Sequence, residues 1–93
     1  YAATKSAVET MSAILSKELR GKDIAVNCVA PGPTETDLFT EGKSQELIDK
    51  LANMSPMERL GQPEDIANVV NFLASDEGHW VNGQVLRANG GII

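Results

Sequence analysis

The feature that most constrains the fold is a short, nearly continuous apolar run, IAVNCVA at residues 24–30, which PGPTET then ends abruptly. A run of this length that follows a polar turn is typical of a β-strand buried on both faces. Proline cannot continue a β-ladder and glycine frees the backbone, so we expect this strand to stop at residue 30. A second short strand, QVLRA at residues 84–88, is predicted after the Asn82-Gly83 turn.

The apolar periodicity also predicts helices at residues 1–20, 44–54 and 61–75. The first helix is expected to end before Gly21, a residue suited to the left-handed conformation that follows many helices. Ser44 is the expected N-cap of the second helix. In the third, Pro63 fits the first helical position, and two acidic residues follow it in the first turn.

The order of these elements predicts the fold class. Two strands separated by helices form a crossover unit, in which the strands are parallel and the connection is right-handed. Two strands are too few for an α/β sheet that stands alone. The chain also begins on a tyrosine rather than a methionine. We therefore expect residues 1–93 to be one portion of a longer α/β domain, incomplete by itself.

Composition disfavours several classes of function. The net charge of −5 comes without a basic block, which disfavours nucleic acid or an anionic membrane surface as a partner. The single cysteine, Cys28, lies in an apolar run typical of buried thiols, and together with one histidine it makes no metal cluster. No apolar run approaches the roughly 18 residues of a transmembrane helix, and no signal peptide is evident. These features predict a soluble, cytoplasmic protein.

Tyr1 and Lys5 stand one helical turn apart on the first predicted helix, with only small residues between them. A free phenol has a pKa of about 10, and an ammonium group held nearby lowers it by favouring the phenolate. Such a tyrosine can protonate an alkoxide-like oxygen or take a proton from an alcohol. Taken alone, the pattern is more often a helix-surface tyrosine beside a solvated lysine, because short patterns occur by chance.

A second group of candidate residues follows the first predicted strand, at the edge of an open α/β sheet where ligands bind. Gly32 would let a ligand approach the backbone closely. Thr34 and Thr36 offer hydroxyl and main-chain N–H groups. The alternative interpretation is an ordinary strand-to-loop connection in which Thr36 caps a local turn.

The order of YAATK, a helix, a strand ending in PG, a PEDIA helix and VNGQVLRANGG resembles the carboxy-terminal half of the short-chain dehydrogenase/reductase family. The likeness covers essentially all 93 residues, and the wording of the last motif is most similar to aldehyde-reductase-like or oxoacyl-reductase-like members. It implies the carboxy-terminal part of a Rossmann-type doubly wound parallel sheet. The glycine-rich nucleotide-binding half of that fold is absent from these residues.

The resemblance also implies an oxidoreductase that transfers a hydride between NADP or NAD and a small carbonyl or alcohol, with NADP favoured. Tyr1 would be the general acid/base and would also contact the cofactor, and Lys5 would hold the nicotinamide ribose and lower the pKa of Tyr1. The other implied cofactor contacts are the nicotinamide pocket at Pro31 and Gly32, the backbone of Thr34 and the hydroxyl of Thr36. Asn89 stands where many members carry aspartate, so the chain lacks that carboxylate as a contact.

Partners implied by the resemblance are the missing amino-terminal half of the fold and further copies in a homo-oligomer. The family's catalytic serine would lie upstream of Tyr1, so we expect the chain alone to be inactive. The competing hypothesis is a non-catalytic α/β interaction or dimerisation module in which Tyr1 is incidental.

Three other groups of residues have weaker signals. The resemblance implies that Leu38 and Phe39 lie in a mobile substrate lid; the alternative is that they fold onto the core. His79 and Trp80 are expected to pack in a loop corner. The three methionines are expected to fill gaps in the interior; they are Met11, Met54 and Met57.

Overall fold

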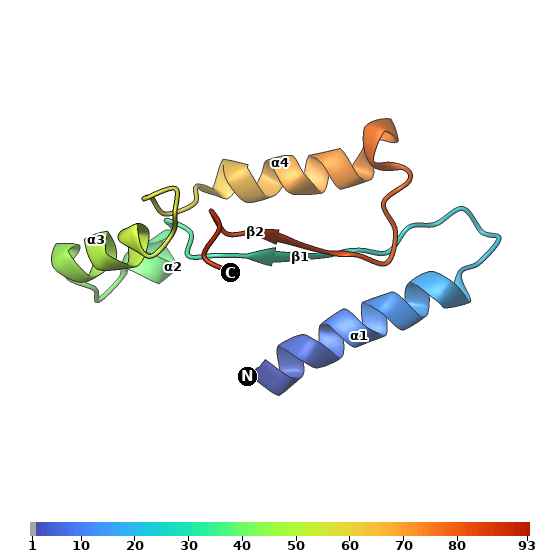
Figure 1. Ribbon diagram of the computed structural model, residues 1–93, viewed down its shortest axis with the longest axis horizontal. Helices are drawn as coiled ribbons and strands as arrows, with labels where there is room; N and C mark the ends of the chain where they lie inside the picture. The colour runs from blue at the N-terminus through green and yellow to red at the C-terminus, as the bar shows by residue number, and fades with distance from the viewer. Residues whose placement is uncertain (1) are drawn as a thin grey trace. The chain divides into compact units, whose positions relative to one another are not determined.

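The computed structural model describes residues 2–93 and is drawn in Figure 1. Its elements are α1 (Ala2–Glu18), β1 (Cys28–Pro31), α2 (Asp37–Thr40), α3 (Gln45–Asn53), α4 (Pro63–Ala74), the 3₁₀ helix η1 (Asp76–Gly78) and β2 (Val85–Ala88). The two strands pair in one sheet, and their arrows point the same way in Figure 1. The predicted α/β class and the order helix, strand, helices, strand are confirmed.

The chain divides into two compact units. One unit runs up to Val29 and includes Val70–Leu86, and the other comprises Ala30–Val69 and Arg87–Ile93. In the first unit, α1 ends at Glu18, two residues before the predicted end, although Leu19 N still donates to Leu15 O at 3.1 Å. Gly21 adopts φ +82°, as expected. This left-handed conformation costs glycine little because it has no Cβ.

β1 begins four residues later than predicted, at Cys28. Residues 24–27 make their hydrogen bonds partly through asparagine side chains instead of a backbone ladder. Val26 N donates to Asn82 Oδ1 at 2.9 Å, and the Asn27 amide donates to Val81 O at 3.0 Å. The strand also continues through Pro31, one residue beyond the predicted end, because the next ladder bond is donated by Gly32 N, to Ala88 O at 3.0 Å.

In the second unit, two predicted helix starts are confirmed. Ser44 accepts a hydrogen bond from Leu47 N at 3.2 Å and so caps α3, and Pro63 is the first residue of α4. The single turn α2 is not predicted by periodicity, because four residues are too few to show it. Thr36 caps this turn by accepting from Phe39 N at 3.2 Å.

Few side chains are fully buried in the part of the chain that the structure describes. Leu60 is the buried hydrophobic residue, and Ser16 and Ser55 are the buried polar ones. The accessible surface is 7018 Å². A folded 9.9 kDa chain exposes about 5,200 Å², so the apolar faces of these elements are largely left uncovered.

Several expectations about packing are therefore wrong. The residues of β1 are half-buried or exposed rather than buried on both faces, and Cys28 is only half-buried. Trp80 is 96% exposed and does not pack in a loop corner. The three methionines are exposed as well. The physical reason is that residues 2–93 provide no further layer of structure against which these side chains can pack. Within the same residues, none of the helices combines the length and the apolar character that crossing a bilayer requires.

The uncovered surfaces predict self-association of the 93-residue chain. α1 exposes four apolar side chains in one region: Val8, Met11, Ile14 and Leu15. β1 pairs only with β2 among the described residues, so its other edge offers free backbone groups. Exposed apolar faces and strand edges recruit other chains. Light scattering coupled to size-exclusion chromatography should therefore find dimers or larger species. A well-folded monomer at all concentrations would contradict this prediction.

Candidate functional site

The structure describes one residue of the predicted proton-transfer pair, Lys5. Tyr1 lies outside the described residues, so its position relative to Lys5 stays a prediction. Lys5 lies in α1, as expected for a residue one turn from the start of that helix.

The other candidate residues form one stretch that connects β1 to α2. Pro31 ends the strand, and Gly32 lies directly against the end of β2. A Cβ atom at Gly32 would lie 2.6 Å from Cβ of Asn89 and 2.7 Å from its Cα, distances that real Cβ atoms do not show. The close approach of the two strand ends therefore requires glycine here. The sequence analysis instead explains Gly32 by the close approach of a ligand to the backbone, and that approach stays a prediction.

The segment after Gly32 is hydrogen-bonded along one of its edges to Gly61. Gly61 N donates to Pro33 O at 2.9 Å, and Glu35 N donates to Gly61 O at 2.7 Å. These two bonds make a parallel bridge between Thr34 and Gly61. Successive N–H groups of an extended segment point to opposite edges, so the N–H groups of Thr34 and Thr36 face away from Gly61.

Neither of these N–H groups has a hydrogen-bond partner within residues 2–93. The threonine hydroxyls, in contrast, make local bonds: Thr34 Oγ1 donates to Gly32 O at 2.9 Å, and Thr36 Oγ1 accepts from Phe39 N. The alternative interpretation of Thr36 as the cap of a local turn is therefore confirmed. The segment offers a ligand a pair of main-chain donors, a set that suits acceptor oxygens of an amide or a phosphate. The cofactor contact through the Thr36 hydroxyl stays a prediction.

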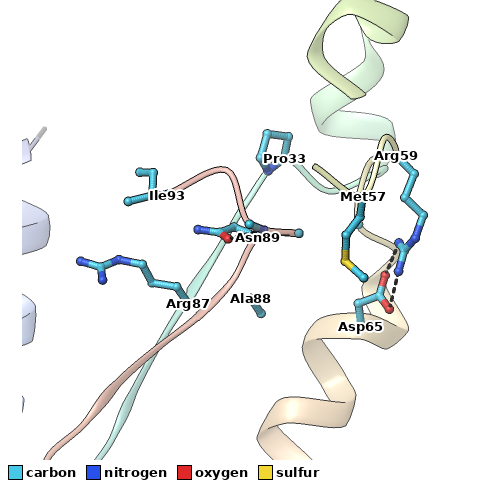
Figure 2. Close-up of a pocket in the computed structure, with 11 residues that line it drawn as sticks. Pro33, Met57, Arg59, Asp65, Arg87, Ala88, Asn89 and Ile93 are labelled. Carbon is cyan, nitrogen blue, oxygen red and sulfur yellow. Dashed lines mark hydrogen bonds and ion pairs between the residues drawn. The ribbon is translucent and has the colours of Figure 1, made fainter. Parts of the chain in front are cut away.

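An ion pair that the sequence analysis did not identify lies next to this segment. Arg59 donates from both terminal nitrogens to the Asp65 carboxylate, at 2.8 and 3.3 Å, as Figure 2 shows. Gln62 N donates to the same carboxylate at 2.7 Å. The hydrogen bond from Arg59 is the main reason that the pKa of Asp65 lies below its ordinary value, and the pKa of Arg59 is raised in return.

The sequence does contain a signal for this carboxylate. Asp65 is the third residue of α4, and it bonds to the backbone N–H of Gln62, the residue before Pro63. This is the reach-back half of a capping box, in which an acidic side chain at the third helical position satisfies an N–H at the helix start. The partner Arg59 has no such local signature, because the spacing of six residues brings the two together only through the loop.

A pocket of about 440 Å³ lies in the second unit, with the ion pair, Pro33 and Asn89 on its wall (Figure 2). Some polar groups of its wall are already hydrogen-bonded. Asn89 Oδ1 accepts from Gly91 N at 3.0 Å, and Ser55 Oγ donates to Gly90 O at 2.8 Å. Asn89 thus closes its own turn, a bond that an aspartate would accept equally well.

The residues of the predicted lid occupy α2. Leu38 is 86% exposed, whereas the ring of Phe39 is covered on one side by Lys43, whose Nζ lies 4.4 Å from the ring centroid. Lys43 also donates to the Phe39 carbonyl. Leu38 therefore does not fold onto the core, and the function of this turn as a substrate lid stays a prediction.

Comparisons with known proteins cover the whole chain. The family model described as enoyl-(acyl carrier protein) reductase matches residues 1–93. The chain is 54% identical over 93 residues to an NADPH-dependent aldehyde reductase-like chloroplastic protein of Arabidopsis thaliana. It is 57% identical over 91 residues to a short-chain type dehydrogenase/reductase of Picea abies. All of this chain is covered in the first alignment and 98% in the second, but only 34% of each relative.

Among solved structures, the chain is similar to the angucycline C-6 ketoreductase LanV with bound NADP. The TM-score is 0.86 at 35% sequence identity, and the match covers 99% of this chain and 35% of that one. The fold of residues 2–93 therefore corresponds to one part of a larger α/β protein such as this ketoreductase. The chain spans about a third of the length of the curated relatives that it matches.

The contact between Gly32 and Asn89 predicts a difference between two glycine substitutions. Gly32→Ala should lower the free energy of unfolding by about 1–3 kcal/mol, because the added methyl group overlaps the Asn89 backbone. Gly61→Ala is the matched control, since its Cβ would meet no atom closer than 3.5 Å and its φ is not positive. Urea unfolding of both variants measures the difference. Equal losses of stability would contradict this explanation for Gly32.

The lowered pKa of Asp65 predicts a pH dependence. An ionised carboxylate with a depressed pKa stabilises the folded state above its ordinary value of 3.8, and this contribution is lost as the pH falls through the folded-state pKa. The difference in the free energy of unfolding between the wild type and Asp65→Asn should thus be constant above about pH 5 and should decrease as the pH falls below that value. Urea unfolding across this range tests the prediction. A difference in unfolding free energy between the wild type and Asp65→Asn that does not change with pH would refute the assignment.

Proposed function

Because the chain belongs to the short-chain dehydrogenase/reductase family, we propose that it is the carboxy-terminal portion of an oxidoreductase. The reaction is the transfer of a hydride between NADP(H) and a carbonyl or alcohol substrate. In this proposal residues 1–93 form part of a single domain, and the glycine-rich half of the nucleotide site lies in the rest of that domain.

The observation that carries the proposal is the pair of unpartnered N–H groups at Thr34 and Thr36. They follow the carboxyl end of β1, the edge at which open α/β sheets bind ligands. The carboxamide and pyrophosphate of a nicotinamide cofactor carry the acceptor oxygens that such donors bind. Pro31 and Gly32 then lie at the start of the same segment and contribute to the nicotinamide pocket.

The choice of NADP(H) rests on relatives. Two Arabidopsis proteins that are 53–54% identical to the chain are named as NADPH-dependent, and the similar ketoreductase structure holds NADP. The residues that separate the two cofactors by their 2′ substituent are expected outside this chain.

Tyr1 and Lys5 carry the proton transfer in the proposed mechanism. When bound, NADP(H) would supply or accept the hydride. During reduction, Tyr1 donates its phenolic proton to the carbonyl oxygen, which leaves an alcohol and a phenolate; during oxidation it takes that proton back. Lys5, one helical turn along, stabilises the phenolate by its positive charge and so lowers the pKa of Tyr1 toward neutrality.

Two further properties stay predictions. The names of the Arabidopsis relatives place them in the chloroplast, so the cytoplasmic location expected from the sequence is untested. Assembly into a homo-oligomer would cover exposed apolar residues such as Met11 and Ile14 of α1. That exposed face also supports the second candidate function, a non-catalytic interaction or dimerisation module.

Substitution of Tyr1 separates the two candidates. In the full-length protein, Tyr1→Phe removes the acidic proton but keeps the ring, so kcat should fall by at least about a hundredfold. Cofactor binding should change little, because no cofactor contact through the ring is lost. Steady-state assays with aldehydes or ketones and NADPH measure the first effect, and quenching of protein fluorescence by NADPH measures the second.

The 93-residue chain itself is the natural control, since we expect it to be inactive without the rest of the fold. Full activity of Tyr1→Phe would refute the catalytic assignment. A full-length wild-type protein that neither binds NADPH nor reduces a panel of aldehydes and ketones would favour the interaction module.

A further inference from the structure

We propose that Asp65 is a positioning residue for cofactor binding. Its carboxylate fixes the loop that contains Gly61, and Gly61 fixes the segment of residues 33–36 whose free N–H groups face the cofactor. The inference rests on the proposed function, since it concerns the same binding segment. It goes beyond that function because the side chains of Asp65 and Arg59 bond to each other and to the backbone of Leu60 and Gln62, and the proposed mechanism does not use them.

The first step is the organisation of residues 59–62 around one carboxylate. Both oxygens of Asp65 accept from the Arg59 guanidinium, and one of them also accepts from Gln62 N at 2.7 Å. Arg59 donates in addition to Leu60 O at 2.9 Å. Both ends of the short loop are thereby bonded to the same side chain. A bidentate pair of this kind fixes geometry as well as charge.

The second step is the link from this loop to the binding segment. Gly61 lies inside the loop and makes both bonds of the bridge, to Pro33 O and from Glu35 N. A side-chain bond runs parallel to the bridge, from Gln62 Nε2 to Glu35 Oε2 at 2.7 Å. Residues 61 and 62 therefore hold the edge of the segment that faces away from the proposed ligand.

The third step is the effect on the opposite edge. In an extended segment, the direction of one N–H group sets the direction of its neighbours. When Gly61 holds Glu35 N and Pro33 O, the N–H groups of Thr34 and Thr36 are aimed the other way before a ligand arrives. Preorganised donors bind more tightly because little conformational entropy is lost on binding. Loosening the loop should thus weaken cofactor binding without touching the chemistry.

A simpler explanation is that Asp65 only caps α4. The pair is half-exposed, with 53% of the Arg59 side chain and 39% of the Asp65 side chain accessible, and isolated surface pairs contribute little. A cap alone would affect the first turn of α4 and leave the bridge intact. The two explanations therefore differ in what happens at the amides of Gly61 and Glu35.

The test uses the full-length protein and two readouts. Residue-resolved hydrogen exchange of the cofactor-free protein reports on the amides of Gly61 and Glu35, and fluorescence titration gives the Kd for NADPH. In Asp65→Ala both amides should exchange at least about tenfold faster, and the Kd should rise about five- to twentyfold, while kcat at saturating NADPH stays within about twofold.

Glu64→Ala is the matched control, because it removes a neighbouring carboxylate of the same turn and the same charge. It should alter neither the two exchange rates nor the Kd. If Asp65→Ala does not fold, Asp65→Asn serves instead, since it keeps the shape and one acceptor oxygen but loses the charge opposite Arg59.

The outcomes separate this inference from the proposed function. Unchanged exchange at both amides in the Asp65 variant, or faster exchange with an unchanged Kd for NADPH, would overturn the inference while the function stands. Absence of NADPH binding by the wild type would overturn the proposed function, and with it the positioning of a cofactor. Faster exchange with a raised Kd and a preserved kcat is the result expected.

Discussion

The parallel pairing of β1 with β2 is the constraint on which the arrangement around the candidate site depends. It brings together Gly32 and Asn89, which are far apart in sequence. The two lie so close that a methyl group on Gly32 would overlap Asn89. The segment that leaves β1 and the turn that leaves β2 thus start from one fixed point. Because parallel strands deliver their carboxyl ends to the same edge, chain segments with acceptor and donor groups accumulate there without any need for a large core. This explains how a chain with one buried hydrophobic residue among those described can still define a local geometry.

Much of the fold was predictable because the local signals agree with one another. The apolar periodicity of the first helix, the cap at Ser44 and the proline at the start of α4 are each local features, and the helix, the cap and the helix start that they predict are confirmed. Strand β1 was predicted less well. An apolar run reports hydrophobicity but not pairing, and Asn27 turns the beginning of the run toward side-chain bonds with the turn before β2. Burial was predicted worst, because the sequence shows which faces are apolar but not whether residues 2–93 supply anything to cover them.

The residues of the candidate site also divide into those with a local signal in the sequence and those without one. The stretch from Pro31 to Thr36 was found from its place after a strand, a local cue that needs no knowledge of the third dimension. Its support was not found: Gly61 and Arg59 contribute through contacts that span a loop, and nothing in their immediate neighbours marks them. Asp65 was noticed only as an acid in a first helical turn, although its spacing from Gln62 is that of a capping box. The candidate residues after β1 and the carboxylate of Asp65 thus each have a local signal in the sequence, whereas Gly61 and Arg59 have none.

The exposure of Trp80 has a practical consequence. It is the single tryptophan of the 93 residues, and its indole is almost entirely in water. An indole in water emits at longer wavelengths than one in an apolar setting, so the colour of its light depends on what lies against it. The fluorescence of Trp80 therefore reports on contacts at this position. A blue shift of its emission maximum when the chain is mixed with another polypeptide would show that the indole has become covered.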